Sequence, residues 1–412
     1  MSHSLASEPA ATAEVPYFPM DRAAGYPFDP PPPLRAAAEH NPVSRVRIWD
    51  GSTPWIITGH AEQKALLTDP RVSVNDRLPG FPHWHAAMRE VSVHRSESVF
   101  NTDPPVHTRF RRMMTAPFTY RRVNGMREVV QQITDELIDQ MLAGPKPADL
   151  VEALALPLPT LMISHILGVP YEDRDFFQHQ ASVGMKRDAN REETMAAYRR
   201  EADYLTGLVR LRAAEPRDDV LSDLAKRVND GEITPAEAAT MGQGLLIAGH
   251  ETSANMIALA TLALLEHPDQ LAVLQQTDDP AVVAAAVEEL LRYLTIIHMG
   301  QRRIAKEDIE IAGQTIRAGE GIIIELAAAD RDPRAFPDPD VLDLRRPRPG
   351  HHAFGFGPHQ CIGQQLARVE LQVVYGTLYR RIPTLRLATT IDKVEFKQDG
   401  LAYGVYSLPV TW

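Results

Sequence analysis

The sequence predicts a mainly α-helical protein with small β-sheets, and three observations lead to that fold class. Long helical patterns, with apolar residues at i, i+3 and i+4, fill the region from 107 to about 294. Short alternating patterns of the strand type lie before and after that region. Neither an internal repeat nor a flexible linker divides the chain, so we expect a single domain over residues 1–412.

The N-terminal part of the chain predicts little helix. A proline-rich lead over roughly 1–33 ends in four consecutive prolines and should be irregular or extended. Residues 43–48 and 55–58 alternate on either side of the Asp50-Gly51 turn, which predicts a β-hairpin. From about 78 to 104 the sequence is loop-like.

The rest of the chain predicts long helices followed by short strands. Helices are expected over 125–142, 155–167, 192–214, 234–266 and 281–294, with a last one over about 362–381. Strands are expected over 309–311, near Ile316, over 321–326 and between the last helix and Trp412.

Composition limits the functions open to this chain. Its 412 residues carry a formal net charge of −11, which argues against a nucleic-acid-binding protein, because such proteins concentrate basic residues on one face. The single cysteine excludes an internal disulfide and an iron–sulfur cluster, and it indicates a reducing, cytoplasmic location. Residues 1–21 contain neither a signal peptide nor the ~20 apolar residues of a membrane span. We therefore expect a cytoplasmic protein without a membrane or nucleic-acid partner.

The only cysteine lies in a glycine-rich segment, Phe354-Gly355-Phe356-Gly357-Pro358-His359-Gln360-Cys361-Ile362-Gly363. Its three glycines allow a sharply bent backbone that can approach a flat ligand. Cys361 comes just before the predicted last helix. The positive end of that helix and its unpaired N–H groups should lower the pKa of the thiol, as a metal-ligating thiolate requires.

Two other interpretations of Cys361 are possible. A free cysteine is often only a small buried apolar residue. A zinc site is the second alternative, because His351, His352 and His359 are close in sequence. A structural zinc site, however, needs four ligands, usually with at least two thiolates or a pair of histidines spaced on a helix, and this segment has neither.

The pattern Phe-Gly-x-Gly-x-His-x-Cys-x-Gly resembles the haem-binding signature of the cytochromes P-450, and all six fixed positions match. The resemblance extends from about Asp21 to Trp412 and is closest to soluble actinobacterial members that accept bulky drug-like or natural-product substrates. It implies the cytochrome P-450 fold and a haem b whose iron is bound by Cys361. It also implies that Phe354, Gly355, His359 and Gly363 contact the haem. A thiolate ligand pushes electron density onto haem iron and favours cleavage of the O–O bond.

A second motif, Ala248-Gly249-His250-Glu251-Thr252, lies within the predicted helix 234–266. By itself it could be a solvent-facing turn, but residues 245–248 and 256–260 are apolar nearly all round, which predicts a helix through the interior. The motif resembles the family's oxygen-binding groove. The resemblance implies that Thr252 hydrogen-bonds the bound oxygen and that Glu251 helps to relay protons. His250 occupies a position that varies in the family.

Other residues acquire roles only through the resemblance. It implies that Glu289 and Arg292 form a buried pair with a third partner, either Arg345 or Arg346. It implies that His107, Arg111, Arg303 and His359 bind the haem propionates, although Arg302 competes for the role of Arg303. Arginine suits a carboxylate because its two parallel N–H groups match the two oxygens. Where relatives usually read Ala-Asn-Arg-Asp, this chain has Ala329-Asp330-Arg331-Asp332, and we expect only a local structural effect.

The resemblance implies a monooxygenase that inserts one atom of dioxygen into a bulky lipophilic small molecule. The chain has no Gly-x-Gly-x-x-Gly between a strand and a helix, so NAD(P)H would act only indirectly, through a separate ferredoxin and ferredoxin reductase. Arg345, Arg346 and Arg348 form either a basic docking face for the ferredoxin or a solvated loop. Candidate pocket residues are Phe81, Trp84, Met185, Ala248, Ile296, Ile297 and Leu401.

Three rival functions stay open at this point. The first is a peroxygenase of the same fold that uses hydrogen peroxide, although such enzymes usually lack the acid–alcohol pair that Glu251 and Thr252 supply here. The second is a haem protein that senses or carries a ligand without catalysis. The third is a haem-free helical protein with a buried cysteine. The sequence does not identify the substrate or the position oxidised.

Overall fold

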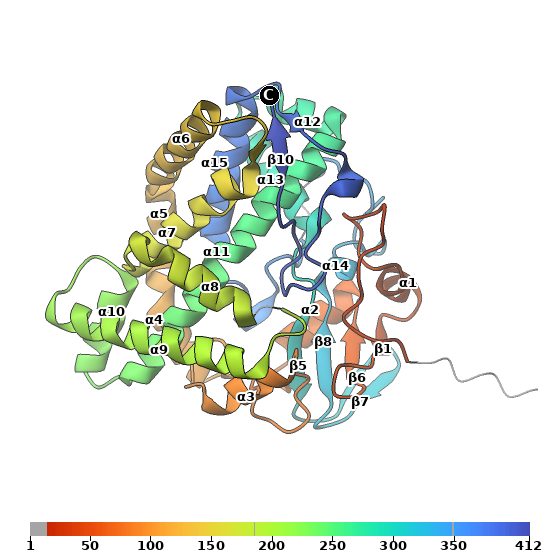
Figure 1. Ribbon diagram of the computed structural model, residues 1–412. Coiled ribbons are helices and arrows are strands. Elements are labelled where there is room, and N and C mark those ends of the chain that lie inside the picture. Colours follow the sequence, from red (N-terminus) through yellow and green to blue (C-terminus); the bar gives the residue numbers. More distant parts are fainter. Residues whose placement is uncertain (1–14, 185, 348–349) are drawn as a thin grey trace, which may run out of the picture.

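The computed structural model describes residues 15–184, 186–347 and 350–412, and in them the chain is mainly helical with small sheets at one side (Figure 1). The α-helices are α1 (Pro32–His40), α2 (His60–Thr68), α3 (Ala86–His94), α4 (Val106–Thr115), α5 (Tyr120–Gly125), α6 (Arg127–Ala143), α7 (Pro157–Leu167), α8 (Arg174–Gly184), α9 (Arg191–Ala214), α10 (Val220–Asn229), α11 (Pro235–Glu266), α12 (Pro268–Gln275), α13 (Pro280–Leu294), α14 (Leu326–Ala329) and α15 (Gln364–Arg381). Short helical turns are η1 (Ala116–Phe118), η2 (Val151–Ala155), η3 (Tyr171–Asp173), η4 (Gly357–His359) and η5 (Ile391–Lys393).

The described strands form three sheets. The strands are β1 (Val43–Arg45), β2 (Trp55–Ile57), β3 (Val72–Ser73), β4 (Ala148–Asp149), β5 (Gln301–Ala305), β6 (Ile309–Ile311), β7 (Gln314–Ile316), β8 (Gly321–Ile324), β9 (Arg386–Leu387) and β10 (Pro409–Thr411). The largest sheet has the order β1-β2-β8-β5-β3, in which β2 and β8 are parallel and the other pairs are antiparallel. β10 pairs with β4 and β9, and β6 pairs with β7.

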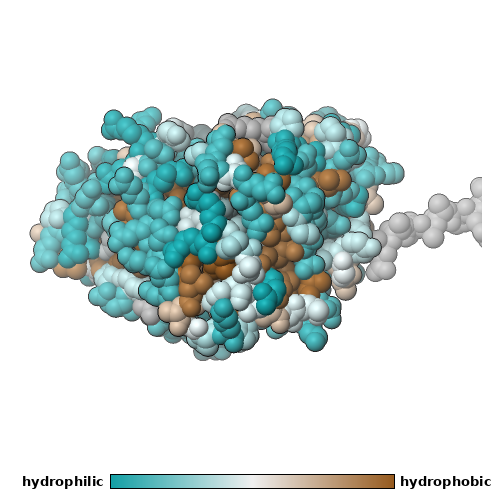
Figure 2. All heavy atoms as spheres, turned by 90° about the horizontal axis from the view of Figure 1, so that it is seen from above, coloured by the Kyte–Doolittle hydropathy of each residue, from teal (hydrophilic) through white to brown (hydrophobic). Residues whose placement is uncertain are grey.

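Helix α11 is the central element of the core. It begins with a capping box, in which the Thr234 hydroxyl accepts a hydrogen bond from the Glu237 amide and the Glu237 carboxylate accepts one from the Thr234 amide. Its apolar residues are buried nearly all round, so it packs against α7 and α9 on one side and against α13 and α15 on another. In contrast, the outer surface is mostly hydrophilic, and apolar residues gather toward the middle of the face shown in Figure 2.

The predicted hairpin and all six predicted long helices are confirmed. The prediction of a loop over 78–104 is wrong in part, because α3 occupies Ala86–His94 and begins where His85 accepts a hydrogen bond from the Met88 amide. Within the lead, residues 1–14 lie outside the described residues, and Pro32 and Pro33 start α1 instead of extending the chain. Proline is well suited to a first helical turn, whose N–H groups have no helical partner.

Among the described residues, no single helix combines the length and the apolar composition of a membrane span. α11 and α12 reach that threshold only when taken together, and they are bent by 110° at their junction.

Candidate functional site

The cysteine segment forms a tight loop between the large sheet and α15. The amide of Cys361 donates a hydrogen bond to the carbonyl oxygen of Phe354 at 2.9 Å, which closes the loop on itself. Gly355 and Gly357 have φ angles of +69° and +73°, a region that favours glycine. A Cβ atom at Gly357 would lie 2.4 Å from the carbonyl oxygen of Leu67 in α2. Two of the three glycines are therefore required by the backbone itself.

The sulfur of Cys361 lies among protein atoms yet keeps solvent-accessible surface, which is the situation of a group that faces an internal space. Burial raises the pKa of its thiol, while N–H groups of Gly363 and Gln364 and the charge of Arg111 act to lower it. The sequence-based expectation of a lowered thiol pKa is therefore wrong for the chain alone, because burial outweighs the start of α15. A metal ion bound to the sulfur would displace the proton, since coordinated thiols are deprotonated.

One turn in the middle of α11 is accessible although the helix is buried on both sides of it. Ala248 is exposed and Thr252 is half-buried, and their four-residue spacing places them on the same face. The Thr252 hydroxyl donates to the carbonyl oxygen of Ala248 at 2.7 Å. A Cβ atom at Gly249 would lie 2.7 Å from Ile163, so glycine allows α7 to pack closely here. His250 is buried, so this segment is not a solvent-facing turn.

Four of the predicted haem-contacting residues come together beside the cysteine loop. His107 and Arg111 lie on α4, Arg303 on β5 and His359 in the loop. The rings of His107 and His359 are 4.0 Å apart between centroids. Burial, together with the nearby His107, Arg303 and Arg111, lowers the pKa of His359 to about 3. The cluster is therefore rich in hydrogen-bond donors and positive charge.

This cluster has donors left over for an anion. The Nε2 atom of His107 is buried and has no partner among the described residues. The Arg111 guanidinium has no hydrogen-bond acceptor there either, and burial lowers its pKa. Arg303 donates only to the Arg302 carbonyl oxygen and to the Gln301 side chain, and burial lowers its pKa to about 10. The nearby carboxylate of Asp103 accepts its hydrogen bonds from Ser73 and Val74, and none of those described comes from this cluster. Cations whose N–H groups are not taken by a carboxylate fit a ligand that brings its own negative charges.

The structure separates Arg303 from its competitor Arg302, because neighbouring residues of a strand point to opposite faces. The charge of Arg303 is one of those that lower the pKa of His359, so Arg303 faces the cysteine loop. The Arg302 guanidinium instead lies 5.4 Å from the ring centroid of Phe18, on the side of the N-terminal segment. The residues present therefore fit a haem group. Cys361 would hold the iron, and His107, Arg111, Arg303 and His359 would hold the propionates.

The pair Glu289–Arg292 is fully buried and bidentate, with Nε–Oε2 and Nη2–Oε1 distances of 2.8 and 2.9 Å. The third partner is Arg346, whose Nε lies 3.1 Å from Oε1 of Glu289. Arg345 is exposed, so the choice between the two arginines falls on Arg346. Asp330, the residue for which the resemblance implied Asn, is buried and accepts hydrogen bonds from the Thr295 hydroxyl and the His352 amide at 2.8 and 2.6 Å.

The candidate pocket residues that the structure describes do not all lie in one place. Ile296 and Ile297 lie beside Leu401, because the Tyr403 amide donates to the Ile296 carbonyl oxygen and the His298 amide donates to that of Leu401. Trp84 donates to the Gly300 carbonyl oxygen at 3.4 Å and so lies near the same segment. Phe81 instead lines a separate pocket of about 760 Å³ between residues 76–83, α3 and the β1–β2 turn. Met185 lies outside the described residues.

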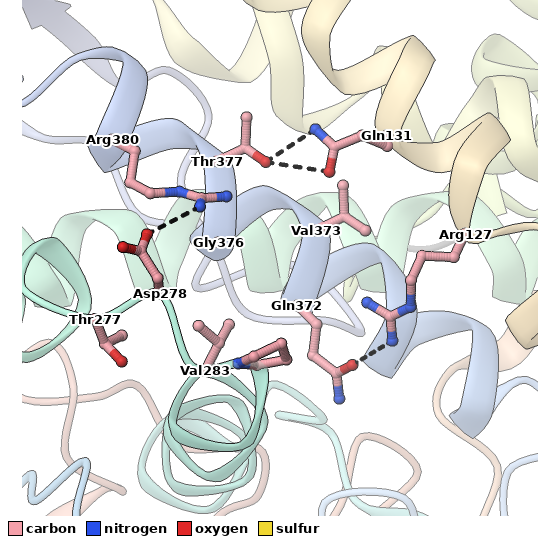
Figure 3. Close-up of a pocket in the computed structure, with 11 residues that line it drawn as sticks. Arg127, Gln131, Thr277, Asp278, Val283, Gln372, Val373, Gly376, Thr377 and Arg380 are labelled. Atoms are coloured by element: carbon pink, nitrogen blue, oxygen red, sulfur yellow. Dashed lines mark hydrogen bonds and ion pairs between the residues drawn. The ribbon is translucent and has the colours of Figure 1, made fainter.

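The sequence reasoning missed Phe100, which packs on α11 one turn before Ala248. A Cβ atom at Gly244 would lie 2.1 Å from the Phe100 ring, so that glycine makes room for it. The only sequence signal was an aromatic residue in a segment taken as loop. A smaller cavity of about 210 Å³ among α6, α13 and α15 includes none of the candidate site residues, and its Arg127, Gln131 and Arg380 side chains already have partners (Figure 3).

The fold and the cysteine site fit a haem-thiolate protein, and comparison with known proteins gives the family. The family model described as Cytochrome P450 matches residues 44–383. The chain belongs to the cytochrome P-450 family and is a monooxygenase of that family.

Several relatives of high sequence identity come from actinobacteria. The chain is 58% identical to cytochrome P-450 CYP105Q4 of Mycobacterium marinum, with 100% of both chains covered. It is 55% identical to cytochrome P-450 GfsF of Streptomyces halstedii, over 99% of this chain and 98% of that one. The crystal structure of GfsF matches 97% of this chain and 100% of its own with a TM-score of 0.90. The structure of mycinamicin VIII C21 methyl hydroxylase from Micromonospora griseorubida, bound to mycinamicin VIII, is 39% identical and matches 97% of this chain and 100% of its own with a TM-score of 0.88.

Proposed function

We propose that this chain hydroxylates a bulky lipophilic small molecule, using a haem b bound through Cys361, dioxygen, and electrons from a separate ferredoxin and ferredoxin reductase. The observation that carries the proposal is the accessible sulfur of Cys361 beside a cluster of cationic and imidazole side chains on α4, β5 and the loop, in which Nε2 of His107 has no partner among the described residues. When bound, the haem supplies the oxidising chemistry, and the chain supplies binding, orientation and proton transfer.

The proposed proton route follows the accessible turn of α11. The Thr252 hydroxyl donates a hydrogen bond to the Ala248 carbonyl oxygen, and from this position it can pass a proton along the accessible face of the helix. Glu251 is half-buried, and its Oε1 lies 3.9 Å from Nζ of Lys397, so its carboxylate faces the C-terminal segment that contains this lysine. An acid and an alcohol in adjacent positions are suited to proton delivery from one side of the helix to the other.

The substrate proposal rests on the apolar wall and on the relatives. Ala248, Ile296, Ile297 and Leu401 offer almost no hydrogen-bonding side-chain groups, which suits a large apolar ligand. Two similar solved structures contain mycinamicin VIII and filipin I. Trp84 and Phe100 are further wall candidates, while Phe81 has a weaker claim because it lines another pocket.

The proposed electron donor is a ferredoxin, and its docking face needs revision. Arg346 is engaged with Glu289 and with the carbonyl oxygens of Pro337, Asp338 and Val341, so it is not available for a partner. Arg348 lies outside the described residues. Of the three arginines, Arg345 is the one that the structure shows as exposed.

The proposal is tested by screening lipophilic compounds for a substrate-induced shift of the haem absorption band, followed by turnover under ¹⁸O₂ with NADPH, a ferredoxin and its reductase. We expect one ¹⁸O atom in the product and product formation that depends on the ferredoxin. Faster turnover with hydrogen peroxide than with the ferredoxin system would favour a peroxygenase. Haem binding without oxygen consumption for any ligand would favour a sensor or carrier, and a colourless protein would contradict haem binding altogether.

A further inference from the structure

A buried network lies between α13, α15 and the segment that leads into the cysteine loop. The Glu288 carboxylate accepts hydrogen bonds from Nε and Nη2 of Arg368 at 2.6 and 3.0 Å and from Nε2 of His351 at 3.1 Å. Their side chains are 17%, 21% and 3% exposed, respectively. None of the three belongs to the donor cluster, the Glu289–Arg292 pair or the candidate pocket described above.

The hydrogen bonds fix the orientation of the groups in this network. The Ala353 amide donates to Nδ1 of His351 at 3.2 Å, so Nε2 is the ring nitrogen that donates to Glu288. Burial would raise the pKa of Glu288, but His351 and Arg368 lower it to about 2. The network therefore sets the guanidinium of Arg368 directly against the carboxylate of Glu288.

Arg368 connects this network to the sulfur. Its guanidinium lies 4.6 Å from the ring centroid of Phe354, whose carbonyl oxygen anchors the Cys361 amide. Its Nη1 also donates to the Gln364 side chain at 2.9 Å, in the first turn of α15. Arg368 is thus placed to withdraw electron density from a sulfur anion, and Glu288 is placed to offset it.

We propose that Glu288 is a positioning residue that neutralises Arg368 and thereby keeps the Cys361 sulfur a strong electron donor to the haem iron. This inference rests on the proposed haem ligation by Cys361. Electron density on the axial ligand is one of the means by which a protein sets the reduction potential of a haem, together with nearby charge and hydrogen bonds. A single uncompensated cation near the sulfur should favour the reduced iron and raise that potential.

The test is the midpoint potential of the full-length holoprotein in four forms, each checked for the carbon monoxide band of thiolate-ligated haem. We expect E288Q to shift the potential in the positive direction and R368M to shift it in the negative direction. The double variant E288Q/R368M should return close to the wild-type value, because both charges are removed together. The matched control is D278N, which removes an exposed carboxylate that pairs with Arg380 and joins the start of α13 to the end of α15. D278N should leave the potential unchanged.

The outcomes separate the tuning role from a structural one. Shifts of E288Q and R368M in the same direction, or a double variant that loses the thiolate band more than either single variant, would overturn the inference in favour of a brace for the loop. An unchanged potential in E288Q would overturn it as well. If E288Q does not retain haem, the negative shift of R368M decides the question. A wild-type protein without the thiolate band would overturn the proposed function itself, before any variant is compared.

Discussion

The substitution of Arg346 by Met tests whether Arg346, and not the adjacent Arg345, is the third partner of the Glu289–Arg292 pair. Arg346 is 11% exposed at its side chain and donates to a carboxylate that is fully buried. The substitution removes that bond but keeps the apolar stem of the side chain in place. Glu289 retains both bonds from Arg292 and one from the Asp343 amide.

The magnitude follows from what is lost and what stays. Breaking a buried ion pair completely costs about 3–5 kcal/mol, which is an upper limit here because Arg292 remains. A single hydrogen bond to a charged group contributes about 1.5–3 kcal/mol. The carbonyl oxygens of Pro337, Asp338 and Val341 can turn to water, so they add little. We expect R346M to lower the free energy of unfolding by about 2–3 kcal/mol.

R345M is the matched control, because Arg345 is exposed and its backbone amide, which the substitution keeps, donates to the Asp343 side chain. It should change the free energy of unfolding by less than about 0.5 kcal/mol. The assay is equilibrium urea unfolding of the holoprotein followed by far-ultraviolet circular dichroism, with the slope compared between variants. Equal destabilisation by R345M and R346M would refute the assignment of Arg346 as the third partner.

Three further predictions concern the helix turn, the loop and the pH dependence. T252A should retain haem and substrate binding but produce severalfold more hydrogen peroxide per NADPH consumed, and tight coupling in this variant would contradict the proton-delivery role. G357A should lower the free energy of unfolding by about 1–3 kcal/mol more than G313A does, and it should also retain less haem. Both positions have φ above +70°, but an added Cβ atom at Gly357 would meet the Leu67 carbonyl oxygen, whereas one at Gly313 would meet nothing. Equal effects of the two substitutions in urea unfolding would show that this contact is unimportant. Because the pKa of Glu288 is lowered from its usual 4.5 to about 2, its contribution to stability is present above pH 4.5 and is lost as the pH falls toward 2. The difference in urea midpoint between wild type and E288Q should therefore be large at neutral pH and shrink below pH 4.5, and a difference that grows with acidity would be inconsistent with this sign.

The family, the fold class and the site elements could be predicted from the sequence because they depend on local patterns. The cysteine motif is contiguous, and the apolar flanks of the Glu251–Thr252 turn lie on one helix. The long helices have a clear period, whereas α3 is short and begins five residues after Phe81, within a stretch whose glycine and prolines suggest a loop.

What the sequence could not give depends on tertiary structure. The choice of Arg303 over Arg302 requires knowing which face of β5 meets the cysteine loop. The choice of Arg346 over Arg345 likewise requires the path of the loop beneath α13. The direction of the Cys361 pKa was misjudged because burial, which is a property of the whole fold, exceeds the local effect of the start of α15. Phe100 was missed because its contact with Gly244 joins distant segments.

The most direct test of the central claim is the absorption spectrum of the reduced holoprotein under carbon monoxide, compared with that of C361H. We predict the band of thiolate-ligated haem for the wild type and the band of imidazole-ligated haem for C361H. C361H should also lose hydroxylation, because a neutral imidazole donates less electron density to iron than a thiolate does. An imidazole-type band in the wild type, or near-normal hydroxylation by C361H, would contradict the central claim.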